Sequence, residues 1–416
     1  MSRRPILGVG AVVLAVTVVL AVLTLGAGGS RPAASGSPGA SGAIGSGEQA
    51  GPIGGPSSGA PTAPPKPGHE LYGYVPYWEM DGGIADHLAK TPLTTLGLYS
   101  VTNKRDGSID TGQQGYKKIT GPIGRQMIRE AHDRKIAVQL TFTSFGDARN
   151  QRLFGPGTTE TQEAVIASLV KMTDDIGVDG ISVDVERLDP ALVPAYGGFV
   201  GRLREALRAR LPNGQVSAST PAGRTGAAMA AAAASAGADR IFLMGYDYHY
   251  GQSDVGASAP MARRDGQEAD LPWSLDLYAS LGVPVEKTIL GLPLYGMRWR
   301  VAGPEIGAER LGDGAIWVPA DYPKFLASPP APPQLDPLEV VDFYSVAPTV
   351  SPVPGDSRAT AGWQAIYVDS PRTLTPKMVL ADGRGLAGAG FWAVGYERGL
   401  DGYRRMMQDF VAGKLE

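Results

Sequence analysis

The chain has 416 residues, of which 43% are hydrophobic, and a formal net charge of -3 at pH 7. A small net charge of mixed signs produces no extended positive field, so we expect no nucleic-acid partner. The absence of cysteine excludes disulfides, thiolate metal sites and a cysteine nucleophile. The four histidines lack the spacing of zinc ligands, so we expect neither a metal nor a cofactor.

The first 29 residues contain a long uncharged apolar run. Arg3 and Arg4 precede this run, which extends from Ile6 to about Ala27. At roughly 20 residues it is long enough to cross a bilayer as a helix, with the arginines on the cytoplasmic side. The run is longer than the apolar core of most signal peptides and has no clear cleavage site. We therefore expect residues 1–29 to form a single-pass anchor in the cell membrane, with the rest of the chain extracellular. A cleaved signal and secretion are the alternative.

Residues 30–68 are nearly all Gly, Ala, Ser and Pro. This composition offers too little apolar surface to offset the conformational entropy lost on ordering. The sequence therefore predicts a disordered linker between the anchor and a folded part that begins at residue 69.

From residue 69 onward, short β-rich runs alternate with segments of helical periodicity. This alternation is typical of a parallel sheet whose strands are covered by helices. Eight strands predict a closed (β/α)8 barrel, because an open doubly wound sheet normally has fewer strands and a Gly-rich phosphate loop after the first. The expected strands are residues 71–75, 96–101, 136–143, 180–186, 216–220, 241–246, 288–292 and 388–393.

The connection between the seventh and eighth expected strands is too long to be a single loop. It runs from Met297 to Leu386, and its first part is rich in proline and aromatic residues. We expect an inserted subdomain over about residues 297–366 within a barrel domain that spans residues 69–416. Residues 371–380 have the pattern of the barrel helix that precedes the last strand.

The segment Val-Asp-Gly-Ile-Ser-Val-Asp-Val-Glu at residues 178–186 carries the most chemical information. Strand side chains alternate between faces, so Ser182, Asp184 and Glu186 point the same way, into the barrel at its carboxyl end. Carboxyl groups two residues apart lie roughly 6 to 7 Å apart at Cβ and can share a proton. Repulsion between them keeps one protonated at neutral pH, as a general acid requires. The alternative is a structural pair neutralised by an arginine, for example a salt bridge with Arg187.

This segment resembles the signature Asp-Gly-x-x-x-Asp-x-Glu of glycoside hydrolase family 18, the family of chitinases. Motifs similar to those of the family occur in order at four other expected strands: residues 72–78 (Tyr-Gly-Tyr-Val-Pro-Tyr-Trp), 244–247 (Met-Gly-Tyr-Asp), 290–296 (Leu-Gly-Leu-Pro-Leu-Tyr-Gly) and 390–393 (Gly-Phe-Trp-Ala). The resemblance covers residues 70–412 and points to a bacterial membrane-anchored or cell-wall branch. It departs from the fullest pattern at Ser182, where an acid usually lies beneath Asp184.

The resemblance implies a catalytic role for four residues. Glu186 protonates the glycosidic oxygen and later takes a proton from water. Asp184 holds the N–H of the substrate's acetamido group, whose carbonyl oxygen attacks the anomeric carbon in place of an enzyme nucleophile. Tyr246 donates a hydrogen bond to the acetamido oxygen, and Asp247 positions the sugar and Asp184. Hydrogen bonding at the barrel rim is the alternative for Tyr246 and Asp247.

Substrate contacts follow from the same resemblance. Trp392 is expected to form the apolar floor beneath the distorted sugar, and Tyr295 to contact the sugar. Tyr77, Trp78 and Trp299 are candidates for flanking subsites. Core packing is the alternative for Trp392, and core or surface roles for the flanking three. Ser182, below Asp184, is included among the substrate-site residues.

The implied function is retaining, substrate-assisted hydrolysis of β-1,4 bonds in polymers that contain N-acetylglucosamine, by a monomer. Chitin, chitooligosaccharides and peptidoglycan glycan all qualify, and a membrane anchor favours substrate near the cell surface. One alternative is a non-catalytic lectin of the same fold, although such proteins usually lack the glutamate that is present here as Glu186. Another is an endo-β-N-acetylglucosaminidase that acts on N-glycans.

Overall fold

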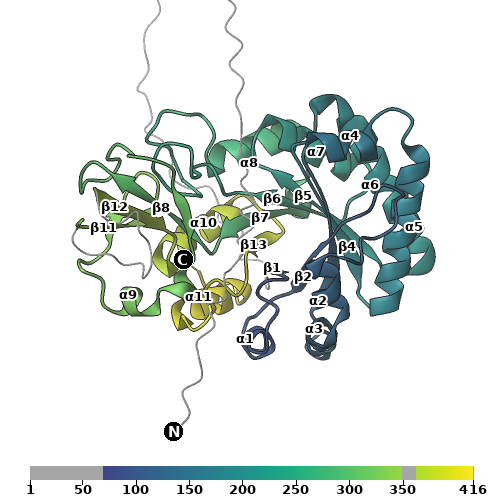
Figure 1. Cartoon of the computed structure of the whole chain (residues 1–416), viewed down its shortest axis with the longest axis horizontal. Coiled ribbons are helices and arrows are strands. Elements are labelled where there is room, and N and C mark those ends of the chain that lie inside the picture. Colours follow the sequence, from purple (N-terminus) through teal and green to yellow (C-terminus); the bar gives the residue numbers. More distant parts are fainter. Residues whose placement is uncertain (1–68, 349–361, 416) are drawn as a thin grey trace, which may run out of the picture. The chain divides into compact units, whose positions relative to one another are not determined.

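The computed structural model describes residues 69–348 and 362–415. Eight parallel strands close into a barrel in the order β1-β13-β7-β6-β5-β4-β3-β2, which confirms the expected (β/α)8 architecture (Figure 1). The barrel strands are β1 (Glu70–Pro76), β2 (Thr95–Val101), β3 (Ala137–Phe145), β4 (Gly180–Glu186), β5 (Gln215–Pro221), β6 (Arg240–Met244), β7 (Thr288–Pro293) and β13 (Gly388–Trp392).

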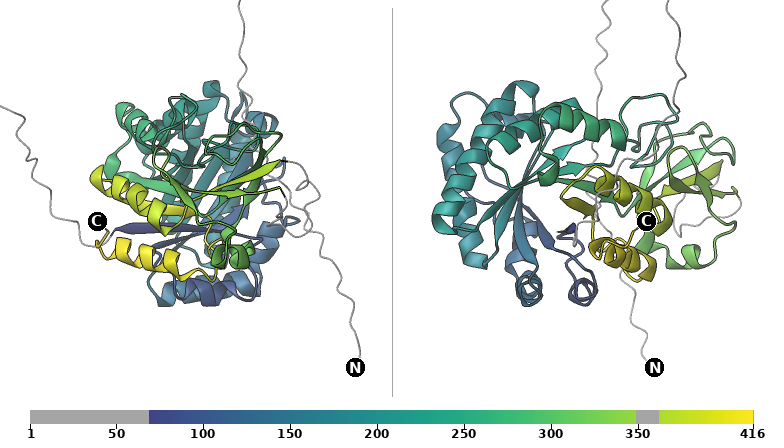
Figure 2. Two further views of the ribbon diagram at one scale, coloured as in Figure 1. Left: turned by 90° about the vertical axis from the view of Figure 1, so that its left-hand side faces the viewer. Right: turned by 180° about the vertical axis from the view of Figure 1, so that it is seen from behind.

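The helices lie around the outside of the barrel, as both views in Figure 2 show. They are α1 (Ile84–Leu88), α2 (Gln114–Thr120), α3 (Pro122–Asp133), α4 (Asp147–Phe154), α5 (Thr159–Ile176), α6 (Val193–Arg210), α7 (Arg224–Ser235), α8 (Leu271–Ser280), α10 (Pro371–Gly383) and α11 (Asp401–Val411), with the short 3₁₀ helices η1 (Pro190–Leu192) and η2 (Val285–Lys287). In the described ranges, no helix combines the length and apolar character needed to cross a membrane. The expected anchor at residues 1–29 and linker at residues 30–68 lie outside those ranges.

A second sheet is inserted between β7 and β13, in the region where the sequence predicts a subdomain over about residues 297–366. Its five antiparallel strands lie in the order β10-β11-β12-β8-β9, beside the barrel in Figure 1. The strands are β8 (Gly296–Val301), β9 (Ala315–Trp317), β10 (Gln334–Asp336), β11 (Val341–Val346) and β12 (Trp363–Val368), accompanied by η3 (Pro319–Asp321) and α9 (Pro323–Ala327).

An aromatic ring fills the barrel interior below the predicted site. Phe242 on β6 is fully buried, and its ring packs 5.0 Å from the ring of Tyr74 on β1. Gly291 and Gly390 make room for it, since a Cβ at either position would lie within 2.4 Å of a Phe242 ring carbon. These two glycines belong to the seventh- and eighth-strand motifs, so packing explains both of them.

The sixth barrel strand is shorter than the expected 241–246. β6 ends at Met244, and the amide of Gly245 donates both to the carbonyl of Gly291 on β7 at 3.0 Å and back to the carbonyl of Leu243 at 2.9 Å, which turns the chain. Asp247 then adopts a left-handed φ of 60°. Tyr246 and Asp247 therefore lie on the loop that follows the strand, at the carboxyl end of the barrel.

Candidate active site

Successive side chains of β4 lie on opposite faces of the strand, as the sequence pattern predicts. Ile181, Val183 and Val185 are fully buried in the core between the barrel and its helices. Asp184 is buried on the opposite face, and Glu186, the last residue of the strand, is partly exposed. The barrel therefore presents both carboxyl groups at its carboxyl end, where loops can admit a substrate.

The electrostatics of this pair favour protonation. Burial, followed by the charge of Glu186, raises the pKa of Asp184 well above its usual value. Burial and the charge of Asp247 raise the pKa of Glu186 from 4.5 to about 7. At neutral pH, Glu186 is therefore poised between its acid and base forms, as acid–base catalysis requires.

No cation in the described part of the chain forms an ion pair with Asp184 or Glu186. Arg187, the proposed structural partner, adopts a left-handed φ of 55° and directs its guanidinium toward Asp147, at 3.8 Å. Asp184 Oδ1 is buried and lacks a hydrogen-bond partner among these residues. The interpretation as a neutralised structural pair is wrong, and Asp184 retains an oxygen that can accept a hydrogen bond from a substrate.

The third acid, Asp247, is held by hydroxyl groups. The hydroxyl of Tyr295 donates to Asp247 Oδ1. Ser258 Oγ accepts from the Asp247 amide at 3.0 Å and donates to the Tyr295 hydroxyl at 3.2 Å. Burial raises the pKa of Asp247, and the hydrogen bond from Tyr295 opposes this shift. The ring of Tyr246 packs edge-on at 6.2 Å from the ring of Tyr295.

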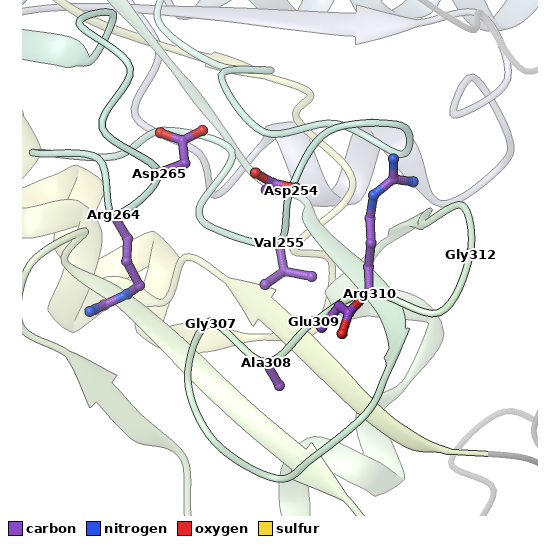
Figure 3. A pocket seen from close by; sticks show the side chains of 9 residues that line it. All are labelled: Asp254, Val255, Arg264, Asp265, Gly307, Ala308, Glu309, Arg310 and Gly312. Carbon is purple, nitrogen blue, oxygen red and sulfur yellow. The ribbon is translucent and has the colours of Figure 1, made fainter.

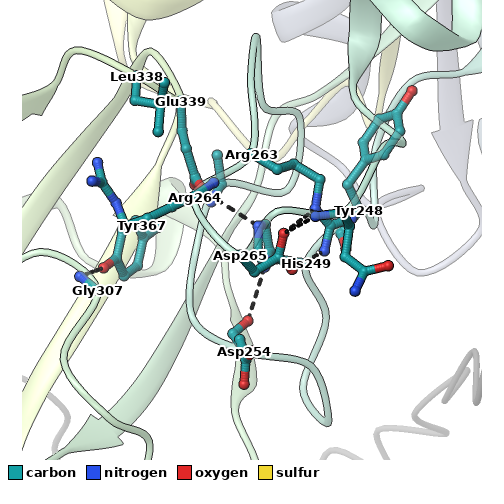
Figure 4. A network of polar contacts seen from close by, with 12 residues as sticks. Tyr248, His249, Asp254, Arg263, Arg264, Asp265, Gly307, Leu338, Glu339 and Tyr367 are labelled. Carbon is teal, nitrogen blue, oxygen red and sulfur yellow. Dashed lines mark hydrogen bonds and ion pairs between the residues drawn. The ribbon is translucent and has the colours of Figure 1, made fainter.

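A polar network fixes the segment that follows Asp247 (Figure 4). Arg263 Nη1 donates to the carbonyl of Tyr248 at 2.9 Å, and His249 Nδ1 lies 2.9 Å from the carbonyl of Asp254. Glu339, from the inserted subdomain, accepts from the amide of Ala257 at 2.6 Å. His249 and Glu339 are buried, so the inserted subdomain braces the loop that carries Asp247.

An aromatic cluster lies at the ends of β1, β2 and β13. The ring of Trp392 packs edge-on to Tyr99 at 4.5 Å and lies 6.2 Å from Trp78. Trp78 is 44% exposed and contacts Tyr77 edge-on at 4.9 Å. Its indole N–H donates to the hydroxyl of Tyr396 at 3.0 Å, which fixes the orientation of the ring. Trp78, Tyr77 and Trp392 thus present an oriented aromatic surface that solvent can reach in part.

The family model described as "Glycosyl hydrolases family 18" matches residues 70–397. This chain belongs to glycosyl hydrolase family 18.

Relatives of known name agree with this assignment. A class V chitinase of Lotus japonicus is 33% identical over 128 residues, which are 28% of this chain and 28% of that protein. The chain spans only between 20% and 39% of the length of the first curated relatives it matches.

Two solved structures share the fold. A chitinase from Chromobacterium violaceum superimposes with a TM-score of 0.62 at 20% identity, covering 83% of this chain and 99% of that one. The spore cortex-lytic enzyme SleL of Bacillus cereus superimposes with a TM-score of 0.63 at 17% identity, covering 82% of this chain and 74% of that one.

Two predicted substrate contacts of this family 18 chain are wrong. Trp299 is buried in the core of the inserted sheet, where its ring packs against Tyr367 at 5.9 Å and its N–H donates to the carbonyl of Gly251 at 3.3 Å. Ser182 is also fully buried, below Asp184. Neither side chain has a surface that a sugar could reach.

Ser182 instead belongs to a layer of hydroxyl groups beneath the acids. The hydroxyl of Tyr74 lies 2.7 Å from both Ser182 Oγ and Ser219 Oγ. Burial raises the pKa of Tyr74 to about 12. The layer below Asp184 is therefore uncharged at neutral pH.

The sequence reasoning missed Tyr74, Ser219 and Tyr99 as site residues. Tyr99 packs against Trp392, and burial, followed by the charges of Asp184 and Glu186, raises its pKa. Tyr74 belongs to the first-strand motif at residues 72–78, and the alternation of side chains along that strand could have assigned it to the barrel interior. Ser219 and Tyr99 carry no comparable signal, because the contact depends on how the strands are ordered in the barrel.

A separate hollow of about 430 Å³ lies where the loop after β6 meets the connection between β8 and β9 (Figure 3). None of the predicted site residues lines it. Its arginines already have partners, since Arg264 pairs with Asp336 at 2.6 Å and Arg310 with Asp313 at 3.5 Å. We therefore assign the active site to the acids and not to this hollow.

Proposed function

We propose that this chain is a retaining glycoside hydrolase that cleaves β-1,4 bonds in polymers containing N-acetylglucosamine, assisted by the substrate's own acetamido group. The observation that carries the proposal is the set formed by the buried Asp184 and the partly buried Glu186 and Asp247, with no ion pair from a described cation to Asp184 or Glu186. Burial and the charge of Asp247 raise the pKa of Glu186 to about 7. A binding protein has no need for a carboxyl group tuned in this way, so this property favours a hydrolase over a lectin.

In the first step, the protonated carboxyl of Glu186 gives its proton to the glycosidic oxygen as the bond to the anomeric carbon breaks. Asp184 accepts the acetamido N–H, and the acetamido carbonyl oxygen bonds to the anomeric carbon, which forms a cyclic oxazolinium ion. Tyr246 donates to that oxygen as the reaction proceeds. Water then attacks the anomeric carbon and displaces the acetamido oxygen, while the Glu186 carboxylate takes a proton from the water. Each of the two attacks inverts the anomeric carbon, so the product retains the configuration of the substrate.

The aromatic cluster supports the same proposal. Trp392 forms the floor beneath the reacting sugar, and Trp78 and Tyr77 contact a neighbouring sugar of the chain. Flat apolar rings pack against the C–H face of a pyranose, so this surface suits an extended glycan.

The substrates to be compared are chitooligosaccharides, purified peptidoglycan strands and an N-glycan. The names of the relatives, a class V chitinase and a spore cortex-lytic enzyme, support the first two. Mass spectrometry of the products should reveal cleavage next to N-acetylglucosamine in one of them, and Glu186→Gln serves as the inactive control. Binding of these glycans without any turnover would instead support the lectin.

We also propose that the monomeric enzyme is held at the cell membrane by residues 1–29, with residues 30–68 as its linker. The support is the long uncharged apolar run and the Gly, Ala, Ser and Pro composition that follows it. Membrane fractionation with N-terminal sequencing tests this. A soluble extracellular form beginning near Ser30 would contradict it and favour secretion.

A further inference from the structure

A buried asparagine on α4 bonds to the main chain at the end of β4. Asn150 is fully buried, and its Nδ2 donates to the carbonyl of Glu186 at 2.7 Å and to the carbonyl of Arg187 at 3.2 Å. Its Oδ1 accepts from Ser144 Oγ on β3 at 2.8 Å. These three contacts fix the orientation of the amide, because only the NH₂ group can donate to two carbonyls.

The same point of the chain has a second donor and an unusual backbone conformation. The amide of Gly146 donates to the carbonyl of Glu186 at 3.2 Å. Arg187 follows with a φ of 55°, which costs an ordinary residue of order 1 kcal/mol. The chain thus turns away from the barrel immediately after Glu186, and Asn150 bonds to both carbonyls of that turn.

We propose that Asn150 is a positioning residue for the reaction, which holds the main chain of Glu186 so that its carboxyl group meets the glycosidic oxygen. The inference rests on the proposed function. The direction of the Glu186 side chain depends on the peptide units on either side of its Cα, and Asn150 bonds to the one that follows. The proposed sugar contacts of Trp392 and Asp247 come from β13 and from the loop after β6.

The effect of losing Asn150 should therefore appear in the chemical step. A displacement of about 1 Å in a reacting group reduces the rate by roughly 10²-fold. Leucine has a shape similar to that of asparagine but no hydrogen-bond donor. In Asn150→Leu, kcat should therefore fall by roughly 10- to 100-fold. KM for a chitooligosaccharide should remain within about twofold of the wild-type value, since ground-state contacts are retained.

Gln162→Met is the matched control. Gln162 is also a buried amide on a barrel helix, and its Nε2 donates to Thr158 at 3.1 Å, away from β4. Both variants lose buried hydrogen bonds and should lower the melting temperature, but only Asn150→Leu should lower kcat. Equal losses of kcat in both variants would show that Asn150 acts through general stability and would overturn the proposal.

A readout independent of turnover separates this inference from the proposed function. Carbon-13 NMR of labelled glutamate, assigned with Glu186→Gln, measures the pKa of Glu186 directly. Because burial is the main cause of its raised pKa, release of the turn should lower that pKa from about 7 toward 4.5 in Asn150→Leu and leave it unchanged in Gln162→Met. An unchanged pKa in Asn150→Leu would overturn the inference, even if the wild-type protein cleaves none of the glycans.

Ser144→Ala covers the case in which Asn150→Leu fails to fold. This change removes the hydrogen bond that orients the Asn150 amide. It leaves in place the Nδ2 group that donates to the carbonyls of Glu186 and Arg187. A loss of kcat of a few-fold at constant KM, together with a smaller drop in the pKa of Glu186, would support the proposal. Wild-type values for kcat and for that pKa would contradict it.

Discussion

Asp184 lies two residues before Glu186 on the same face of β4, and burial together with the charge of Glu186 raises the pKa of its carboxyl group. Asp247 acts on Glu186 in the same way from the end of β6. The three acids thus form a connected set, in which a change to one alters the protonation of the next.

Glu186→Gln should remove most of the activity, because the leaving group then departs without a proton. General acid catalysis contributes roughly 10² to 10⁴ in rate, so kcat should fall by that factor. The amide has nearly the same shape, and calorimetric binding of a chitooligosaccharide should survive. Turnover at the wild-type rate would show that Glu186 is not the acid.

The stability of the wild-type protein should decrease between pH 4.5 and 7 relative to Glu186→Gln. The pKa of Glu186 is about 7 in the folded protein and 4.5 in a free side chain, so in this interval the folded state binds more protons than the unfolded state. Stability therefore falls as pH rises, by up to roughly 3 kcal/mol at 1.36 kcal/mol per pH unit. Urea unfolding at several pH values measures the free energy of unfolding of both proteins. If this free energy changed with pH in the same way in wild type and Glu186→Gln, the prediction would be contradicted.

The 2-acetamido group of the substrate should be obligatory. If the acetamido oxygen is the nucleophile, an aryl chitobioside is cleaved with retained configuration and the matching cellobioside is inert. A thiazoline analogue of the oxazolinium ion should inhibit, since mimics of a high-energy intermediate bind tightly. Comparable hydrolysis of the cellobioside, or a sugar ester trapped on Asp184, would exclude the mechanism.

Tyr295→Phe should move the alkaline limb of the kcat profile to lower pH. The hydrogen bond from Tyr295 opposes the raised pKa of Asp247, so its removal leaves Asp247 protonated to higher pH. A neutral Asp247 no longer raises the pKa of Glu186, which then loses its proton earlier. Tyr248→Phe is the control, because that hydroxyl donates to Ser274 at 2.7 Å instead. An identical profile in Tyr295→Phe and wild type would argue against coupling between the two acids.

Gly390→Ala should destabilise the barrel by roughly 1 to 3 kcal/mol through overpacking. The added Cβ would lie 2.4 Å from a ring carbon of Phe242 and 2.8 Å from the carbonyl oxygen of Tyr72. Gly82→Ala should be close to neutral, since a Cβ there meets nothing within 4 Å. Thermal unfolding of both variants tests whether packing around Phe242 explains the glycine.

The sequence by itself determined the barrel, the strand that carries the acids and the direction in which they point. Residues 180–186 alternate with period two, so Asp184 and Glu186 had to share a face whichever strands lay beside them. The family motifs supplied the roles of Tyr246 and Asp247, which are still predictions.

The tertiary structure alone decided what surrounds those acids. Tyr74 lies 108 positions before Ser182, and Asn150 lies 36 positions before Glu186, yet both pairs are in hydrogen-bond contact. Trp299 was expected to bind sugar because it is a tryptophan, but the pairing of β8 with β12 buries its side chain. Such contacts depend on the order of the strands in each sheet and on the course of the chain between them, and local periodicity carries no information about either.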